Sequence, residues 1–201
     1  MPRPKKTPEE IQVMREKIQS TAIEILQDEG FHAVTSRSIA AKLGMSHMSL
    51  FTYFENQLEI FSSMANGYME RINTHLDTFV ERAKKEDILP LVEETWQCLL
   101  EFILQNPALH RLTWSTFGAE SIDTNPGNDG IISRLAKLLV IGMERGAFEH
   151  RNPQLAAITF IGCLNMPFVL HHTGKVQDIS LRDQLVDEGL VAAIRYLEKK
   201  K

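Results

Sequence analysis

Apolar residues recur along most of the chain with the three- and four-residue spacing of amphipathic helices, and no window alternates as a strand does. The first apolar stripe follows Thr7-Pro8-Glu9-Glu10, which supplies an N-cap, a first-turn proline and a capping-box glutamate, and Gly30 is placed to end that helix. Further helices are expected at 36–43, 46–53, 55–82, 87–105, from Asn106-Pro107 onward, at 130–145 and 153–172, and at 181–198 after a capping box at Ser180–Asp183. With about nine helices and no strand, the pattern predicts an all-α fold.

Turn-forming residues divide these helices into two groups. The longest predicted helix, 55–82, connects a small three-helix unit at 1–54 to a larger helical bundle at 55–201. The only long turn-rich segment, GAESIDTNPGNDG at 118–130, lies in the second group. A chain of 201 residues is long enough to hold both units.

The stretch SIAAKLGMSHMSLFTYF at 38–54 has the residues that two steeply crossing helices need. Ala40 is small enough for close approach, Gly44 tolerates a positive φ in the turn, and Ser46 can cap the second helix. Apolar residues flank the turn, as they must to fill the space between the helices. A short turn containing glycine between two such helices is typical of a helix-turn-helix.

The exposed face of the second helix is the informative part of this stretch. It carries His47, Met48, Ser49 and Thr52, whereas a solvated helix face usually carries Lys, Glu and Arg. Hydroxyl and imidazole groups can bond to base edges and phosphates, and a methionine can contact a thymine methyl. We therefore interpret the stretch as a DNA-reading element, with an ordinary helical hairpin as the alternative.

Charge supports this interpretation by its distribution and not by its total. The net charge is −4, but residues 1–54 hold seven Lys/Arg and six Asp/Glu, a balance of +1 that leaves −5 for the rest. Within 30–54 no acidic residue occurs, while Arg37 and Lys42 are present.

Residues 22–61 resemble the N-terminal domain of the TetR family of transcriptional regulators, in a first helix ending Glu-Gly-Phe, in Thr35-Ser36-Arg37, in Leu43-Gly44-Met45-Ser46 and in Leu50-Phe51-x-Tyr53-Phe54. The resemblance implies a homodimer whose recognition helices, here 46–52, enter successive major grooves of a palindromic operator. It further implies phosphate contacts from Ser36, Arg37 and Ser46, base contacts from His47, Met48 and Ser49, and backbone contacts from Tyr53, with Thr52 on the same face. The basic arm Arg3, Lys5 and Lys6 either reaches the DNA or is a solvated tail.

Two positions depart from the family pattern. Phe51 stands where the family usually has tyrosine, and Gln57 stands where it usually has lysine. Each change removes a group that would bind phosphate, and the loss of a cation at Gln57 should flatten the salt dependence of DNA binding.

The C-terminal bundle is less informative, because core packing alone accounts for most of its apolar stripes. The resemblance implies that some of these residues line a cavity for a small, lipophilic effector, with polar His110 and Thr113 as further candidates beside Trp96, Phe102, Trp114, Phe117, Met143, Asn165, Phe168 and His171. The last two helices, 153–172 and 181–197, carry more apolar surface than a solvated helix needs, and they are the expected dimer interface, at Leu181, Leu185, Ala192 and Leu197.

No cofactor, metal site or catalytic motif is expected. His171 and His172 are adjacent and would point about 100° apart on a helix, and no Cys-x-x-Cys or His-x-x-x-His spacing is present. Cys98 and Cys163 lie in apolar runs, which favours buried thiols in a reducing compartment. The N-terminus lacks a signal-peptide core, and the apolar runs look too short or interrupted to span a bilayer, so we expect a soluble, cytoplasmic protein.

These features predict a ligand-responsive DNA-binding transcriptional regulator that is not an enzyme. As a repressor it would leave a palindromic operator when a small lipophilic effector binds. Two alternatives stay open: a lipophile-binding helical protein with weak or lost DNA binding, and an all-α enzyme in which the N-terminal unit only packs.

Overall fold

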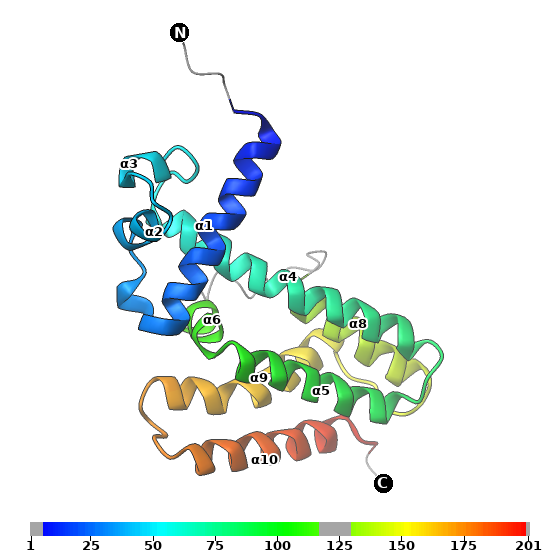
Figure 1. The fold of residues 1–201 in the computed structure, drawn as a ribbon. Helices are drawn as coiled ribbons and strands as arrows, with labels where there is room; N and C mark the ends of the chain where they lie inside the picture. The colour runs from blue at the N-terminus through cyan, green and yellow to red at the C-terminus, as the bar shows by residue number, and fades with distance from the viewer. Residues whose placement is uncertain (1–5, 117–129, 200–201) are drawn as a thin grey trace. The chain divides into compact units, whose positions relative to one another are not determined.

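The computed structural model describes residues 6–116 and 130–199, and every regular element in these ranges is helical (Figure 1). The all-α prediction is therefore confirmed for the described chain. The elements are α1 (Pro8–Glu29), the 3-10 turn η1 (Phe31–Ala33), α2 (Ser36–Lys42), α3 (His47–Leu50), α4 (Gln57–Ala83), α5 (Ile88–Gln105), α6 (Pro107–Arg111), the π-helical turn η2 (Leu112–Thr116), α8 (Ile131–Glu144), α9 (Pro153–His172) and α10 (Ile179–Leu197).

Most helix ends follow the predicted capping chemistry. The Thr7 hydroxyl accepts a hydrogen bond from the Glu10 N–H, and the Glu10 carboxylate accepts one from the Thr7 N–H, which completes the capping box of α1. Asn152 caps α9 by accepting a hydrogen bond from the Leu155 N–H at 3.0 Å.

Two predicted helix ends are wrong. The helix expected at 46–53 is the single turn α3, and turn structure follows it. α10 starts at Ile179, because Asp178 and not Ser180 is its N-cap, accepting a hydrogen bond from the Ser180 N–H at 2.8 Å. α6 starts at Pro107 as predicted, and the Asn106 side-chain amide donates to the Phe102 carbonyl at 3.2 Å at the end of α5.

The chain divides into two compact units, and the division falls within α4, between Tyr68 and Met69. The first unit comprises Met1–Tyr68 with Ala108–Leu112. In it, α1 packs on α2 and α2 packs on α3. Its buried apolar side chains include Ile18, Ala22, Ile25, Leu26, Val34, Ile39, Ala40, Leu50 and Phe54.

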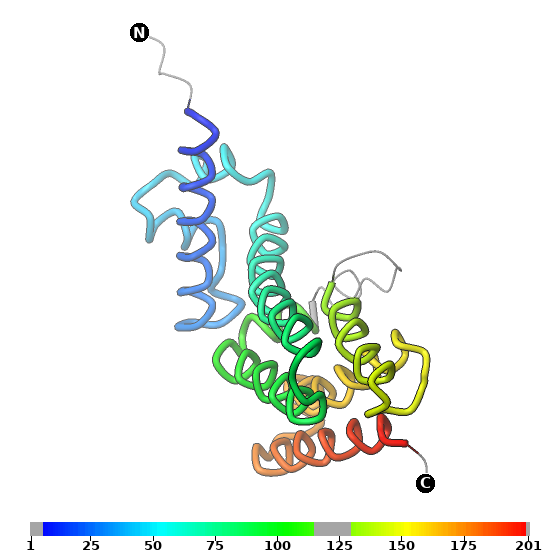
Figure 2. The backbone as a smooth tube through the Cα atoms, turned by 90° about the vertical axis from the view of Figure 1, so that its right-hand side faces the viewer, coloured from blue at the N-terminus to red at the C-terminus, as the bar shows by residue number. Residues whose placement is uncertain are grey.

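The second unit comprises Met69–Pro107 with Thr113–Lys201, and α9 lies at its centre. α9 packs on α8 on one side and on α10 on another, and Figures 1 and 2 show α9 and α10 side by side in opposite directions. The buried Trp96 ring of α5 meets the Phe160 ring of α9 edge to face, with 5.3 Å between centroids. This contact ties α5 to the centre of the bundle.

α9 has the bounds that the sequence predicts, 153–172. It has 20 residues with a mean hydropathy of 1.5, so by length and composition it is the one described helix that could cross a membrane. Its expected exclusion as too short or interrupted was therefore wrong. Because α9 packs against α8 and α10, the arrangement is also that of a core helix in a soluble bundle.

The crossing of α9 and α10 is unusually close at Gly189. A Cβ added there would lie 2.8 Å from the Cys163 carbonyl oxygen and 3.3 Å from the Trp96 ring. Pro167 lies one helical turn after Cys163 and has no N–H, so it cannot donate the usual helical hydrogen bond to that carbonyl. The carbonyl that lacks its usual helical donor thus lies where α10 has a glycine.

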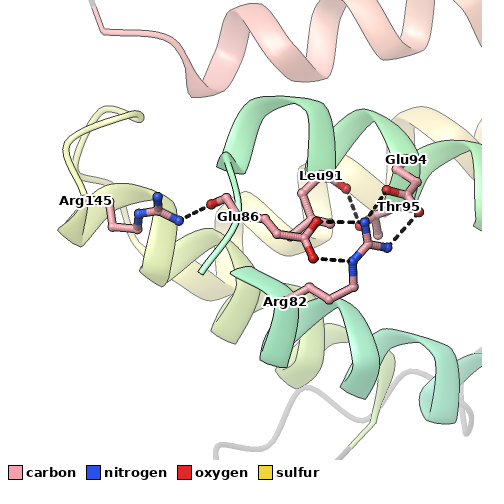
Figure 3. A network of polar contacts seen from close by, with 6 residues as sticks. All are labelled: Arg82, Glu86, Leu91, Glu94, Thr95 and Arg145. Carbon is pink, nitrogen blue, oxygen red and sulfur yellow. Dashed lines mark hydrogen bonds and ion pairs between the residues drawn. The ribbon is translucent and has the colours of Figure 1, made fainter. Parts of the chain in front are cut away.

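Arg82 organises the corner between α4 and α5 (Figure 3). Its guanidinium donates to the Glu86 carboxylate at 2.9 and 2.8 Å and to the Glu94 carboxylate at 2.7 and 2.8 Å. Arg145, at the end of α8, donates to the Ala83 carbonyl at 2.7 Å and also contacts the Glu86 carbonyl. These two arginines hold the ends of three helices together.

Cys98 and Cys163 are free thiols that are half-buried and not fully buried as expected. Burial raises the pKa of both, and for Cys98 the neighbouring Glu101 and Glu94 raise it further. Both thiols are therefore less acidic than an ordinary cysteine.

Candidate nucleic-acid interface

The turn between α2 and α3 has the geometry that the sequence predicted. Gly44 has φ of +66°, and its N–H bonds to the Ala41 carbonyl at 3.1 Å, while the Met45 N–H bonds to the Ala40 carbonyl at 2.9 Å. This pair of bonds is a Schellman motif. A Cβ at Gly44 would meet no atom within 4 Å, so the positive φ, and not lack of space, explains the glycine.

The start of α2 is built on a reciprocal cap. The Thr35 hydroxyl accepts from the Ser38 N–H, and the Ser38 hydroxyl accepts from the Thr35 N–H, each at 3.0 Å. Ser36 is half-buried and Arg37 is exposed in the first turn that follows. Within the described chain the Arg37 side chain makes no ion pair, so its charge is available to a partner.

The hydroxyls of the recognition segment are already hydrogen-bonded within it. Ser46 Oγ accepts from the Ser49 N–H at 3.1 Å and lies 2.7 Å from Ser49 Oγ. Thr52 Oγ1 donates to the Ser49 carbonyl at 2.7 Å. Ser46, His47, Met48 and Thr52 are exposed and Ser49 is half-buried. Met48 is 66% exposed.

The charged side chains of the helix-turn-helix segment, residues 30–54, are all basic. No acidic residue lies in 30–54, and Lys42 pairs with Glu24 of α1 at 3.2 Å through two largely exposed side chains. Such an exposed pair is weak and leaves Lys42 able to bind another anion.

Lys6 and Tyr53, both predicted to contact DNA, contact each other. The Lys6 ammonium lies 4.1 Å from the centroid of the Tyr53 ring and is hydrogen-bonded to its hydroxyl. Tyr53 is only 7% exposed. Arg3 and Lys5, the other predicted arm residues, lie outside the described residues.

The two departures from the family pattern have structural roles of their own. The Gln57 side chain donates to the Val34 carbonyl at 2.8 Å and so ties the start of α4 to the segment before α2. Phe51 is half-buried, and its ring meets the edge of the His47 imidazole at 5.8 Å between centroids. The sequence carried no signal for the Gln57 contact, since it joins residues far apart in the chain.

The predicted effector residues occupy varied environments in the second unit. Trp96 and Met143 are buried, Phe102 stacks edge-on with His75 at 5.0 Å, and Arg182 lies 5.2 Å from the centroid of the buried Phe168 ring. Asn165 is buried, and Trp114 is half-buried in η2. The half-buried His171 ring forms a hydrogen bond through Nδ1 with the Val176 carbonyl at 2.9 Å. Phe117 lies outside the described residues.

Thr113 is different from the others. It is fully buried in the π-helical turn η2, and its hydroxyl has no hydrogen-bond partner within the described chain. His110, the second polar candidate, is also fully buried.

The predicted dimer residues separate into two kinds. Leu181 and Ala192 are exposed and Leu185 is half-buried, whereas Leu197 is 1% exposed and lies in the core of its own chain, where its carbonyl accepts from the Glu149 N–H at 2.9 Å. Leu197 therefore offers no side-chain surface to a partner. Further exposed apolar residues of α9 and α10 are Leu155, Ile158, Met166, Ile179 and Val191.

Among the described residues, no group of three or more His, Cys, Asp or Glu side chains is placed to hold a metal ion.

Comparison with known proteins places this helix-turn-helix in a family. Residues 18–64 match the family model described as bacterial regulatory proteins, tetR family. Residues 18–64 thus carry the N-terminal domain of the TetR family. The match covers α2, the Gly44 turn and α3, the same residues whose geometry is described above.

Curated relatives match part of the chain. The tetracycline repressor protein class C of Escherichia coli is 30% identical over 63 residues, which cover 31% of this chain and 29% of that protein. The nucleoid occlusion factor SlmA of Aliivibrio fischeri (strain MJ11) is 27% identical over 99 residues, covering 49% of this chain and 50% of that protein. The chain thus matches half or less of the length of these relatives.

Solved structures share the fold over nearly the whole chain. A candidate TetR-family transcriptional regulator from Mesorhizobium loti MAFF303099 has a TM-score of 0.71 at 15% identity, covering 96% of this chain and all of that one. A candidate fatty acid metabolism regulator from Clostridium perfringens has a TM-score of 0.65 at 15% identity, covering 92% of this chain and all of that one. At this identity the likeness concerns the fold alone.

Proposed function

We propose that this TetR-family protein is a DNA-binding transcriptional regulator, and specifically a cytoplasmic repressor that a small lipophilic effector releases from a palindromic operator. The observation that carries the proposal is the helix-turn-helix, in which Arg37, His47 and Met48 are exposed and Arg37 makes no ion pair with another described residue. It acts by binding and not by catalysis.

The exposed groups suggest a division of roles on DNA. Arg37 and Lys42 bind phosphates, which sets affinity without reading sequence. His47 and Met48 approach base edges in the major groove, where a methionine can contact a thymine methyl. Ser36, Ser46, Ser49 and Thr52 have hydroxyl oxygens that keep acceptor capacity after their internal bonds, so they contribute at the margins of the same surface.

Effector control requires a second site and two arrangements of the dimer. Thr113 supports a site in the second unit, because a buried hydroxyl without a partner is costly and π-helical turns often occur at functional positions. An effector that favours a spacing of recognition helices other than about 34–36 Å must lower operator affinity, and DNA must lower effector affinity reciprocally.

The test is a comparison of two variants on two kinds of DNA. An operator is first selected from a random DNA pool with the intact protein. Met48→Ala should reduce the preference for operator over random DNA by about fivefold or more and leave the salt dependence unchanged. Arg37→Ala should weaken binding to both DNAs equally and lower the salt slope by about 0.9.

Lys175→Ala is the matched control, since it removes an exposed cation from the second unit and should leave the salt slope unchanged. Binding by the wild type that never distinguishes operator from random DNA would contradict the proposal. Tight binding of lipophilic compounds with no DNA binding at low salt would instead support the alternative, a lipophile-binding helical protein.

A further inference from the structure

Arg15 lies on α1, outside the helix-turn-helix, yet it contacts three groups around the end of the recognition segment. Its guanidinium carbon lies 4.1 Å from the centroid of the Phe54 ring. One terminal nitrogen donates to the Tyr53 carbonyl, and the other donates to the Glu59 carboxylate at 2.6 Å. A single side chain thus joins α1, residues 53–54 and the first turns of α4.

The groups that Arg15 holds are those on which the recognition segment ends. The N–H groups of Tyr53 and Phe54 bond back to the Leu50 carbonyl at 3.0 and 3.3 Å, so these residues continue directly from α3. Phe54 is buried in the core of the unit. Any shift of residues 53–54 therefore moves α3, which is only four residues long and has little stability by itself.

Glu59 anchors the other end of this arrangement. Its carboxylate accepts hydrogen bonds from Arg15 and from the Glu55 N–H at 2.5 Å, and the Asn56 side chain accepts from the Glu59 N–H at 2.9 Å. The bond from Arg15, followed by that from Glu55, lowers the pKa of Glu59 below its ordinary value of 4.5. The carboxylate is therefore ionised, and paired with Arg15, throughout the neutral range.

We propose that Arg15 is a positioning residue for DNA recognition, which fixes the orientation of α3 through Tyr53 and Phe54 without touching DNA. This inference rests on the proposed function. The Arg15 side chain is 30% exposed, and its donors point at acceptors of the protein itself. Its planar fork can donate in two directions while stacking on a ring, which a lysine ammonium cannot do.

The experiment measures operator and random-DNA affinity over a salt series for the intact wild type, Arg15→Met and Arg15→Lys. Arg15→Met keeps much of the side-chain bulk, and it should raise the operator Kd about tenfold, the equivalent of one lost base contact, without changing the random-DNA Kd or the salt slope. The operator Kd of Arg15→Lys should lie between those of the wild type and Arg15→Met, because the lysine keeps a positive charge opposite Glu59. Glu59→Gln, which retains the contacts of Arg15 with Tyr53 and Phe54, should have the smaller effect.

Ile25→Val is the matched stability control, since it removes one buried methyl group from α1 at a distance from Arg15. A loss of operator preference in Ile25→Val equal to that of Arg15→Met would overturn the inference, because general loosening would then explain both. An unchanged operator Kd in Arg15→Met, or a reduced salt slope that marks a phosphate contact, would overturn it as well.

Amide hydrogen exchange of the DNA-free protein separates this inference from the proposed function. Arg15→Met should speed exchange at residues 50–56 more than in the rest of the first unit. If the wild type does not distinguish operator from random DNA, the proposed function is wrong. Faster exchange at 50–56 in Arg15→Met would still show that Arg15 positions α3. Unchanged exchange there would remove the positioning role whatever the DNA result.

Discussion

The carboxylates that Arg82 holds differ electrostatically from an ordinary surface glutamate. The hydrogen bonds from Arg82 lower the pKa of Glu86 and of Glu94 below the ordinary value of 4.5, and the same bonds raise the pKa of Arg82. All three groups are open to solvent, so water and salt screen the interaction. Its contribution to the stability of the fold nevertheless depends on pH.

We predict that Arg82→Met makes the stability of the second unit depend less on pH in the acid range. Because both carboxyl pKa values are lower in the folded state, their stabilisation is complete above about pH 4.5 and is lost as pH falls through the folded values. Wild type and Arg82→Met should therefore differ in melting temperature at pH 7 and converge as pH falls below about 4.5. Thermal unfolding followed by circular dichroism measures this, with Arg195→Met as the control, and a difference that stays constant with pH would contradict it.

The interface residues show why single side chains are hard to assign from sequence. Ser46, Ser49 and Thr52 were predicted as DNA contacts because short hydroxyl residues suit a DNA face, but the same residues are also the best caps and backbone partners in a one-turn helix. Arg15 and Gln57 could not be found in this way, because their partners are distant in sequence and only the folded unit brings them together.

At the scale of elements, the predictions succeeded where local chemistry alone decides. The Asn152 cap and Pro153 mark the start of α9, and the positive φ at Gly44 follows from the need for a tight turn. α3 is shorter than predicted because the segment after it is held by tertiary contacts to Tyr53 and Phe54 and not by further helical turns. α10 starts earlier because Asp178 competes with Ser180 as the cap.

The contact between α9 and α10 gives a prediction at this scale. Gly189→Ala should destabilise the protein by about 1–3 kcal/mol, because a Cβ placed 2.8 Å from the Cys163 carbonyl forces the two helices apart. Gly67→Ala in α4 is the control: a Cβ there meets no atom within 4 Å, and the better helix propensity of alanine should be neutral or stabilising by up to about 1 kcal/mol. Urea unfolding measures both, and equal effects of the two substitutions would refute the close approach at Gly189.

At the scale of the whole molecule, the exposed apolar residues of α9 and α10 point to a second copy of the chain. Leu155, Ile158 and Met166 follow one another on α9 at three and eight residues, a spacing that keeps them on one face. On α10, Leu181 and Val191 are exposed, and Ala192 is exposed beside them. A palindromic operator requires two recognition segments, so the proposed homodimer would cover these residues and supply both.

We predict that Met166→Glu converts the proposed dimer to a monomer. Met166 is 54% exposed in the single chain, and a carboxylate at a symmetric apolar interface would be buried without a partner. Val13→Glu on α1 is the matched control, since it places the same charge on an exposed apolar position of the first unit and should leave the mass unchanged. Native mass spectrometry or light scattering gives the oligomeric state. The monomer should also lose operator binding while keeping its helix content, because one recognition segment reads only a half-site; a Met166→Glu protein that stays dimeric would place the interface elsewhere.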